Sequence, residues 1–132
     1  MTWLQSGDAG VDTTMRAVFA ARRGEHAEAI SLLDTLIETR PDYAEAWNQR
    51  ATTYFEIGDD EASLSDIAET LRREPRHFGA LAGRAMIRIR RGEISAAIAD
   101  IEAAMRLHPF LGERRFLPAL RRAVQERRGR PI

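Results

Sequence analysis

A spacing of 34 residues recurs along this chain of 132 residues. Three different residue types keep the same spacing, so chance explains it poorly. Such a period is typical of repeat architectures, in which one short unit of secondary structure is stacked on copies of itself. The repeating positions are Pro41, Pro75 and Pro109, then Gly24, Gly58 and Gly92, and the dipeptides Arg16-Ala17, Arg50-Ala51 and Arg84-Ala85.

Each period contains two helical patterns. In the first pattern, apolar residues stand three or four positions apart, which places them on one face of a helix. A second set of helices is expected at about residues 10–22, 43–56 and 77–90. The apolar faces of the first set comprise Ile30, Leu33, Leu36 and Ile37, then Leu64, Ile67, Ala68 and Leu71, and finally Ile94, Ala97, Ile98, Ile101 and Met105.

Glycine and proline mark the ends of these helices. Each repeated glycine follows a helix of the second set, where the chain must adopt a positive φ. Each repeated proline ends a helix of the first set, because proline has no N–H and restricts the residue before it. Asp59 is expected to cap the helix after Gly58, and Asp42 with Glu45 to form a capping pair. The stretch TRPDYAEAW, residues 39–47, is therefore a joint between two helical hairpins.

The middle repeat resembles a tetratricopeptide repeat. Trp47, Ala51, Tyr54, Gly58 and Pro75 stand where that family has its large, small, large, turn and proline residues. A related helical-hairpin family found in RNA processing shares the repeat length, but the glycine, alanine and proline pattern favours the tetratricopeptide family. The flanking repeats depart from the pattern, with Thr13 and Leu81 in place of the tryptophan and Ala20 and Arg88 in place of the tyrosine. In the middle repeat, Ser63 stands where Ala29 and Ala97 keep the small residue.

The resemblance implies an all-α solenoid. Helical hairpins of this family stack into a right-handed superhelix, here expected as a single domain over residues 1–132 without β-strands. The three repeats are expected at about residues 10–43, 44–77 and 78–111.

The two ends of the chain lie outside these repeats. A C-terminal helix at about residues 113–128, with Leu117, Leu120 and Val124 on one face, is expected to cap the last repeat. It either starts near Pro118, where proline is tolerated, or kinks there. Trp3–Gly7 is expected to be the tail of a missing preceding helix.

Composition limits where such a chain can reside. With 44% hydrophobic and 30% charged residues, it has the balance of a soluble helical protein. No apolar run approaches the ~20 residues that cross a bilayer, and the start has no features of a signal peptide. The chain is expected to be cytoplasmic by default, or periplasmic if a signal peptide has been removed. All 20 of its basic residues are arginine, which favours a GC-rich bacterial genome.

The sequence offers no constellation for catalysis. There is no cysteine, and no metalloprotease, phosphate-loop or nucleophile-elbow motif. His26, His77 and His108 fall in turns and joints and are expected to be exposed there. We therefore expect no enzyme activity, no cofactor and no metal site.

Arginine and aspartate recur together in two repeats. Asp66 follows Arg50 by 16 residues, and Asp100 follows Arg84 by the same interval. In a helical hairpin this spacing brings opposite positions of two antiparallel helices together, which predicts partly buried ion pairs. Arg16 has Leu32 at the matching position, although Asp34 is close.

Members of the resembled family bind ligands along the first helix of each hairpin, which here means the helices at about residues 10–22, 43–56 and 77–90. Chaperone-docking members clamp a terminal carboxylate there with lysine, asparagine and arginine; the matching positions here are Thr14, Val18, Gln49, Gly79 and Gly83, so that clamp is absent. The C-terminal segment is an alternative occupant of part of this face. The predicted groove comprises Thr14, Met15 and Val18, then Asn48, Gln49, Thr52 and Phe55, then Ala82, Gly83, Met86 and Ile89, with Arg22 and Arg90 at its edge.

The predicted function is a scaffold that binds a protein or peptide segment in this groove. One alternative is binding of nucleic acid or an acidic partner through the arginine-rich C-terminal half, but the neutral overall charge argues against nucleic acid. Weak self-association is the other, because residues 1–66 carry a net charge of −8 and residues 67–132 one of +8. No membrane association is expected. The predicted basic patch comprises Arg114, Arg115, Arg121, Arg122, Arg127 and Arg128.

Overall fold

A computed structural model describes the backbone of residues 3–129 and the side chains of residues 10–129. Within this range the chain forms seven α-helices and no β-strand, which confirms the all-α prediction. The helices are α1 (Trp3–Arg22), α2 (His26–Thr39), α3 (Ala44–Glu56), α4 (Asp60–Arg73), α5 (Phe78–Arg90), α6 (Ile94–Leu107) and α7 (Leu117–Gly129), with a 3₁₀ helix, η1 (Gly112–Phe116), before the last.

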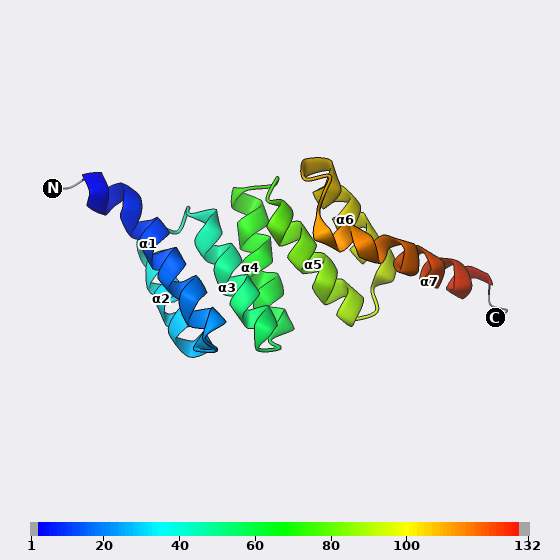
Figure 1. Cartoon of the computed structure of the whole chain (residues 1–132), viewed down its shortest axis with the longest axis horizontal. Coiled ribbons are helices and arrows are strands. Elements are labelled where there is room, and N and C mark those ends of the chain that lie inside the picture. The colour runs from blue at the N-terminus through cyan, green and yellow to red at the C-terminus, as the bar shows by residue number, and fades with distance from the viewer. Residues whose placement is uncertain (1–2, 130–132) are drawn as a thin grey trace. The chain divides into compact units, whose positions relative to one another are not determined.

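Contacts divide the chain into two compact units. The N-terminal unit, Met1–Pro75, contains the hairpins α1/α2 and α3/α4, and the C-terminal unit, Arg76–Ile132, contains the hairpin α5/α6 followed by η1 and α7 (Figure 1). The repeat boundaries and the superhelix expected from the sequence remain predictions.

The turns inside the three hairpins share one backbone conformation. Gly24, Gly58 and Gly92 have φ of 80°, 84° and 78°, the left-handed region that disfavours a side chain. The amide N–H of the residue after each glycine reaches back to a helix carbonyl, as Asp59 N–H does to the Tyr54 oxygen at 2.9 Å. The glycine period of the sequence is therefore a period of turns.

The helix caps agree only in part with the sequence. The Asp59 carboxylate accepts a hydrogen bond from the Ala62 N–H at 3.2 Å, as expected. The prediction that Asp42 and Glu45 form a capping pair is wrong, because the N-cap residue of α3 is Tyr43, whose side chain makes no cap hydrogen bond. Glu45 instead accepts from the side-chain amides of Asn48 and Gln49 one turn later.

The first helix is longer than expected. It starts at Trp3 and runs unbroken to Arg22, so Trp3–Gly7 belongs to α1 and is not the tail of another helix. Gly10 lies inside this helix, close to the Arg40 guanidinium and the Tyr43 ring of the following segment. A Cβ at this position would meet Arg40 Nη1, the far end of a flexible side chain, so a small movement of the arginine would make room for it.

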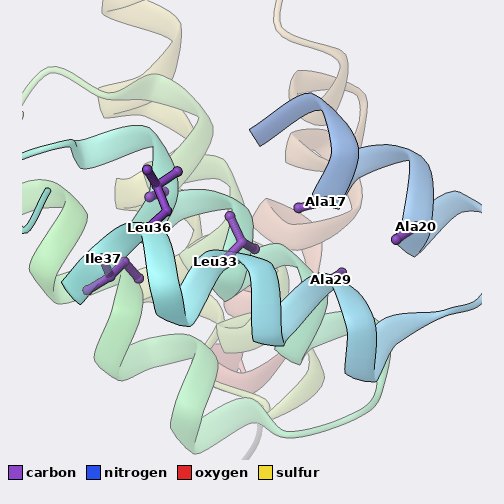
Figure 2. Close-up of a cluster of buried hydrophobic side chains, with 7 residues drawn as sticks. Ala17, Ala20, Ala29, Leu33, Leu36 and Ile37 are labelled. Carbon is purple, nitrogen blue, oxygen red and sulfur yellow. The ribbon is translucent and has the colours of Figure 1, made fainter. Parts of the chain in front are cut away.

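The core of the N-terminal unit fills the space between α1, α2 and α3. Small residues of α1 face larger ones of α2, which lets the two helices approach closely. Figure 2 shows Ala29, Leu33, Leu36 and Ile37 along α2, with Ala17 and Ala20 on the neighbouring segment of α1. The buried cluster comprises Ala17, Ala20, Ala29, Leu33, Leu36, Ile37 and Ala46.

The buried face of α4 is unusually polar. Ser63 donates to the Ala51 carbonyl at 2.7 Å, and Thr70 donates to the Asp66 carbonyl at 2.9 Å. These bonds satisfy groups that would otherwise be costly to bury. Ala68, which the sequence places on the apolar face, is exposed instead.

The C-terminal unit has its own core, which α7 completes. Leu117 and Leu120 of α7 are buried against Ala85, Ala97 and Ile101 of the α5/α6 hairpin. The helix begins one residue before Pro118, so the proline lies in the first turn and causes no interruption. The predicted capping helix is thus present, with Val124 half-buried at its margin.

Candidate functional site

A cleft of about 280 Å³ lies between the first helices of the two hairpins in the N-terminal unit. Residues three or four positions apart on each helix point into it. Val18 and Ala21 give it an apolar wall, and Gln49 and Thr52 a polar one. The complete lining comprises Val18, Ala21 and Arg22 from α1, and Gln49, Thr52, Thr53 and Glu56 from α3.

The polar side chains of this cleft are held in place by neighbours. Glu45 accepts from the Gln49 amide at 3.0 Å. Glu56 lies 3.2 Å from the imidazole of His26, the first residue of α2. Arg22 and Glu56 thus place opposite charges on the two walls of the same cleft.

The structure brings together only part of the predicted groove. Val18, Gln49 and Thr52 line the cleft, and Arg22 joins them from its predicted edge. Ala21, Thr53 and Glu56 were missed, although Ala21 stands one helical turn from Val18 and Glu56 two turns from Gln49. Met15, Asn48 and Phe55 do not line the cleft, and Met15 is exposed one helical turn before Val18.

The predicted groove residues of the C-terminal unit have different surroundings. Ala82 is buried, so it offers little surface to a ligand. Gly83 and Met86 are half-buried. Ile89 packs against the cluster that contains Leu117 and Leu120, so the C-terminal helix shares its surface.

A second cleft of about 280 Å³ lies between α1 and α2 and was not predicted. Its lining is rich in hydroxyls, but Thr35 and Thr39 donate theirs to backbone carbonyls one turn earlier in α2. Such local bonds reduce what the hydroxyls offer to a ligand. The lining comprises Gly10, Thr13, Arg16, Ser31, Leu32, Thr35, Leu36, Thr39 and Arg40.

Arg50 joins the two hairpins of the N-terminal unit. Its Nε and Nη2 donate to the Asp66 carboxylate at 2.8 and 2.9 Å, and its Nη1 donates to Asp34 at 2.8 Å. These bonds, above all those to Asp66, raise the pKa of the Arg50 guanidinium. The guanidinium also lies over the rings of Trp47 and Tyr54. The Arg50–Asp66 prediction is confirmed, and Asp34 belongs to this cluster.

The C-terminal unit contains the second predicted pair with a different third member. Arg84 binds both oxygens of Asp100, at 2.8 and 3.0 Å. Arg88 binds the same carboxylate at 2.8 Å. Asp100 is buried and therefore depends on both arginines for its hydrogen bonds.

The six arginines of the predicted basic patch are all exposed. Arg121 pairs with Glu102 at 3.0 Å, and Arg127 donates weakly to the Gly92 carbonyl. Arg114 and Arg115 lie over the rings of Phe110 and Phe116. Four of the six arginines in the patch therefore already contact other residues of the C-terminal unit.

The histidines are more engaged than expected. His77 Nδ1 accepts from the Ala80 N–H and caps α5, and the His108 ring lies 4.9 Å from the Phe78 ring. With His26 beside Glu56, each has a partner and is half-buried, so the expectation of exposed turn histidines is wrong. In the part of the chain that the structure describes, no cluster of histidine and acidic residues could hold a metal ion. No helix there is both long and apolar enough to cross a membrane.

The repeats and the fold have known counterparts. The chain is 38% identical over 110 residues to a TPR repeat-containing protein of Rhizobium etli, covering 83% of this chain and 54% of the relative. It is 41% identical over 80 residues to the protein FlbA of Caulobacter vibrioides, covering 61% of this chain and 13% of that protein. The chain therefore spans about half of the first relative and a small part of the second. No family model matches it.

Solved structures with low sequence identity share the fold. The first TPR of Spaghetti (RPAP3), bound to the HSP90 peptide SRMEEVD, has a TM-score of 0.81 at 19% identity and covers 88% of this chain and 93% of its own. The Sgt2 TPR domain from Aspergillus fumigatus also has a TM-score of 0.81, at 20% identity over 94% of this chain and 85% of its own.

Proposed function

Because the chain is a tetratricopeptide repeat protein by its fold and its repeats, we propose that it is a non-catalytic scaffold that binds a segment of another protein. The observation that carries this proposal is the cleft between α1 and α3, which lies along the first helices of two hairpins. The first TPR of Spaghetti was solved with a bound peptide, which supports a peptide as the class of ligand.

The ligand of this cleft differs in chemistry from an acidic peptide terminus. A clamp for a terminal carboxylate needs cationic side chains in the groove. Thr14, at one of the clamp positions, is buried and donates its hydroxyl to the Gly10 carbonyl at 2.7 Å, so it is not available to a ligand. Gln49 stands at another such position and carries no charge.

The cleft instead fits an extended segment that inserts one apolar side chain. Val18 and Ala21 provide the apolar wall for that side chain, and the volume of about 280 Å³ suits one or two residues rather than a whole small molecule. Gln49 can bond to the peptide backbone alongside, whereas the Thr52 hydroxyl already donates to the Asn48 carbonyl at 3.1 Å and offers only its oxygen as an acceptor. Arg22 and Glu56 then favour a segment with charges of both signs beside the inserted residue.

The test uses peptides selected on the native chain from a displayed random library. Thr52→Trp fills the cleft with a bulky ring, and Ser65→Trp places the same ring at an exposed position of α4 as a matched control. Fluorescence anisotropy should show at least about tenfold weaker binding for Thr52→Trp, equivalent to about 1.4 kcal/mol, and native affinity for the control.

Equal peptide affinity of the two variants would show that the peptide does not bind in this cleft. Met86→Glu and Gly83→Leu ask in the same assay whether α5 also contributes to the site. Circular dichroism should show native helix content in every variant, so that lost binding is not lost folding.

A further inference from the structure

Exposed apolar side chains gather at two places on the described surface. Six large hydrophobic residues are exposed there, and five of them belong to two groups. We call Val11, Met15 and Phe19 of α1 the apolar stripe, and Phe78, His108, Phe110 and Arg114 the aromatic edge. Single exposed hydrophobics need no explanation, but grouped ones mark interaction sites.

The apolar stripe lies on one face of α1. Its members are four residues apart, so their side chains point the same way along the helix. None of them lines the cleft between α1 and α3. Thr53 and Ile87, which match Phe19 in the 34-residue period, are both buried, whereas Phe19 is exposed. The Phe19 position is therefore covered in the other two repeats and open in α1, whereas the residues that match Val11 and Met15 in those repeats are half-buried.

The aromatic edge lies where α6 ends in the C-terminal unit. The Phe110 side chain is 78% exposed, and the Arg114 guanidinium lies 5.6 Å from the centre of its ring. Phe78, the first residue of α5, contacts His108 ring to ring. The period places Asp42 and Arg76 at the position of Phe110, and Ala44 at that of Phe78, so the repeat itself does not require aromatic residues here.

The two groups lie on units of opposite charge. The N-terminal unit holds 15 acidic residues and 7 arginines, a net charge of −8. The C-terminal unit holds 5 acidic residues and 13 arginines, a net charge of +8. The apolar stripe thus belongs to the acidic unit and the aromatic edge to the basic one. The charge complementarity is between the units, because α1 itself holds two aspartates and two arginines.

We propose that the aromatic edge of one copy docks on the apolar stripe of a second copy. The phenylalanine rings would cover the exposed face of α1, and the arginines beside them would meet the acidic unit. Such a contact joins two different surfaces, so the copies associate head to tail. A row of copies then has a free apolar stripe at one end and a free aromatic edge at the other. Salt weakens it, because exposed charges are screened over about 10 Å at 0.1 M ionic strength.

Sedimentation velocity of the full chain over a range of concentrations tests the proposal. The native chain should associate beyond a dimer or close into a ring at low salt, and dissociate as salt rises. Phe19→Ser and Phe110→Ser should each abolish association by themselves. Ile57→Ser is the matched control, because Ile57 is similarly exposed but belongs to neither group, and it should associate like the native chain.

Mixing the two inactive variants separates this contact from a symmetric one. The Phe19→Ser copy keeps its aromatic edge and the Phe110→Ser copy keeps its stripe, so an equimolar mixture should form a dimer and nothing larger. A symmetric contact between two stripes or between two edges would be lost in only one of the two variants, and the other variant would associate without mixing. A native chain that stays monomeric at every concentration, or a mixture that stays monomeric, would overturn the proposal.

The same samples distinguish other occupants of the aromatic edge. Arginine beside exposed rings also suits single-stranded nucleic acid, whose bases stack on aromatic side chains. A fluorescent oligothymidylate added to the native chain should compete with self-association at most weakly, because the acidic unit repels it. Tight binding of the oligonucleotide by a monomer would replace the second copy with nucleic acid as the partner.

Discussion

Arg50 shows how one side chain can fix the distance between two hairpins. Its two carboxylate partners lie 16 residues before it and 16 residues after it, in α2 and α4. Asp66 is only 5% exposed in its side chain, whereas Asp34 is 48% exposed. The bond to Asp66 is therefore little screened by water, and the bond to Asp34 is weakened by it.

This difference predicts unequal effects of mutation. Arg50→Ala should destabilise the N-terminal unit by roughly 3 kcal/mol, because it leaves Asp66 buried without its cation. Asp34→Ala should cost less than about 1 kcal/mol, since its carboxylate is solvated. Urea denaturation should show that Arg50→Ala/Asp66→Ala costs less than the sum of the two single changes. The exposed pair Arg23–Glu25 is the control, and additivity at Arg50 as well would contradict the coupling.

The sequence predicted half of this cluster. The interval from Arg50 to Asp66 repeats in Arg84 and Asp100, so the period itself drew attention to it. The bond to Asp34 occurs once, because Ala68 and not an acid follows Asp34 in the period. Likewise, the cleft residues Ala21 and Glu56 carry no repeated signal. Each shares a helix face with Val18 or Gln49, and the packing of α1 beside α3 sets those two faces opposite each other. Contacts between repeats are the part that a one-dimensional period does not encode.

At the scale of helices and turns, each hairpin depends on one left-handed residue. A Cβ at Gly58 would meet no atom within 4 Å, so space is not the reason for glycine. The reason is φ of 84°, which a residue with a side chain adopts only at a cost.

Gly58→Ala should therefore destabilise the N-terminal unit by about 1 kcal/mol through backbone strain alone. Gly58→Asn should cost less, because asparagine tolerates this conformation better than alanine. Thermal denaturation followed by circular dichroism measures both changes. An alanine variant as stable as the native chain would show that the turn relaxes to another conformation.

The predicted helix ends were correct where a residue type repeats with the period, and wrong where they depend on the conformation of a single joint or terminus. The glycines and prolines located the ends of most helices, because each has a backbone restriction that acts alone. Asp42 and Glu45 have the spacing of a capping pair, but the joint places Tyr43 at the N-cap position. The start of α1 has no counterpart in the period, so no repeated signal extends that helix to Trp3.

At the scale of the molecule, the two compact units are the relevant parts. Repeat proteins gain stability from each repeat and from its contacts with neighbours, so separate parts can unfold separately. Each unit has its own buried cluster, centred on Leu33 in one and on Ile101 in the other. Both tryptophans, Trp3 and Trp47, belong to the N-terminal unit. Tryptophan fluorescence therefore reports on that unit, while circular dichroism reports on the helices of both.

The two signals should separate when the C-terminal unit is weakened. Leu120→Ala removes a buried side chain of α7 and should destabilise that unit by about 2–4 kcal/mol. In urea, the circular dichroism curve should gain an earlier transition, whereas the midpoint of tryptophan fluorescence should stay at its native value. Leu33→Ala is the reciprocal control, and it should lower the fluorescence midpoint. If Leu120→Ala moves both midpoints together, the two units unfold as one cooperative structure.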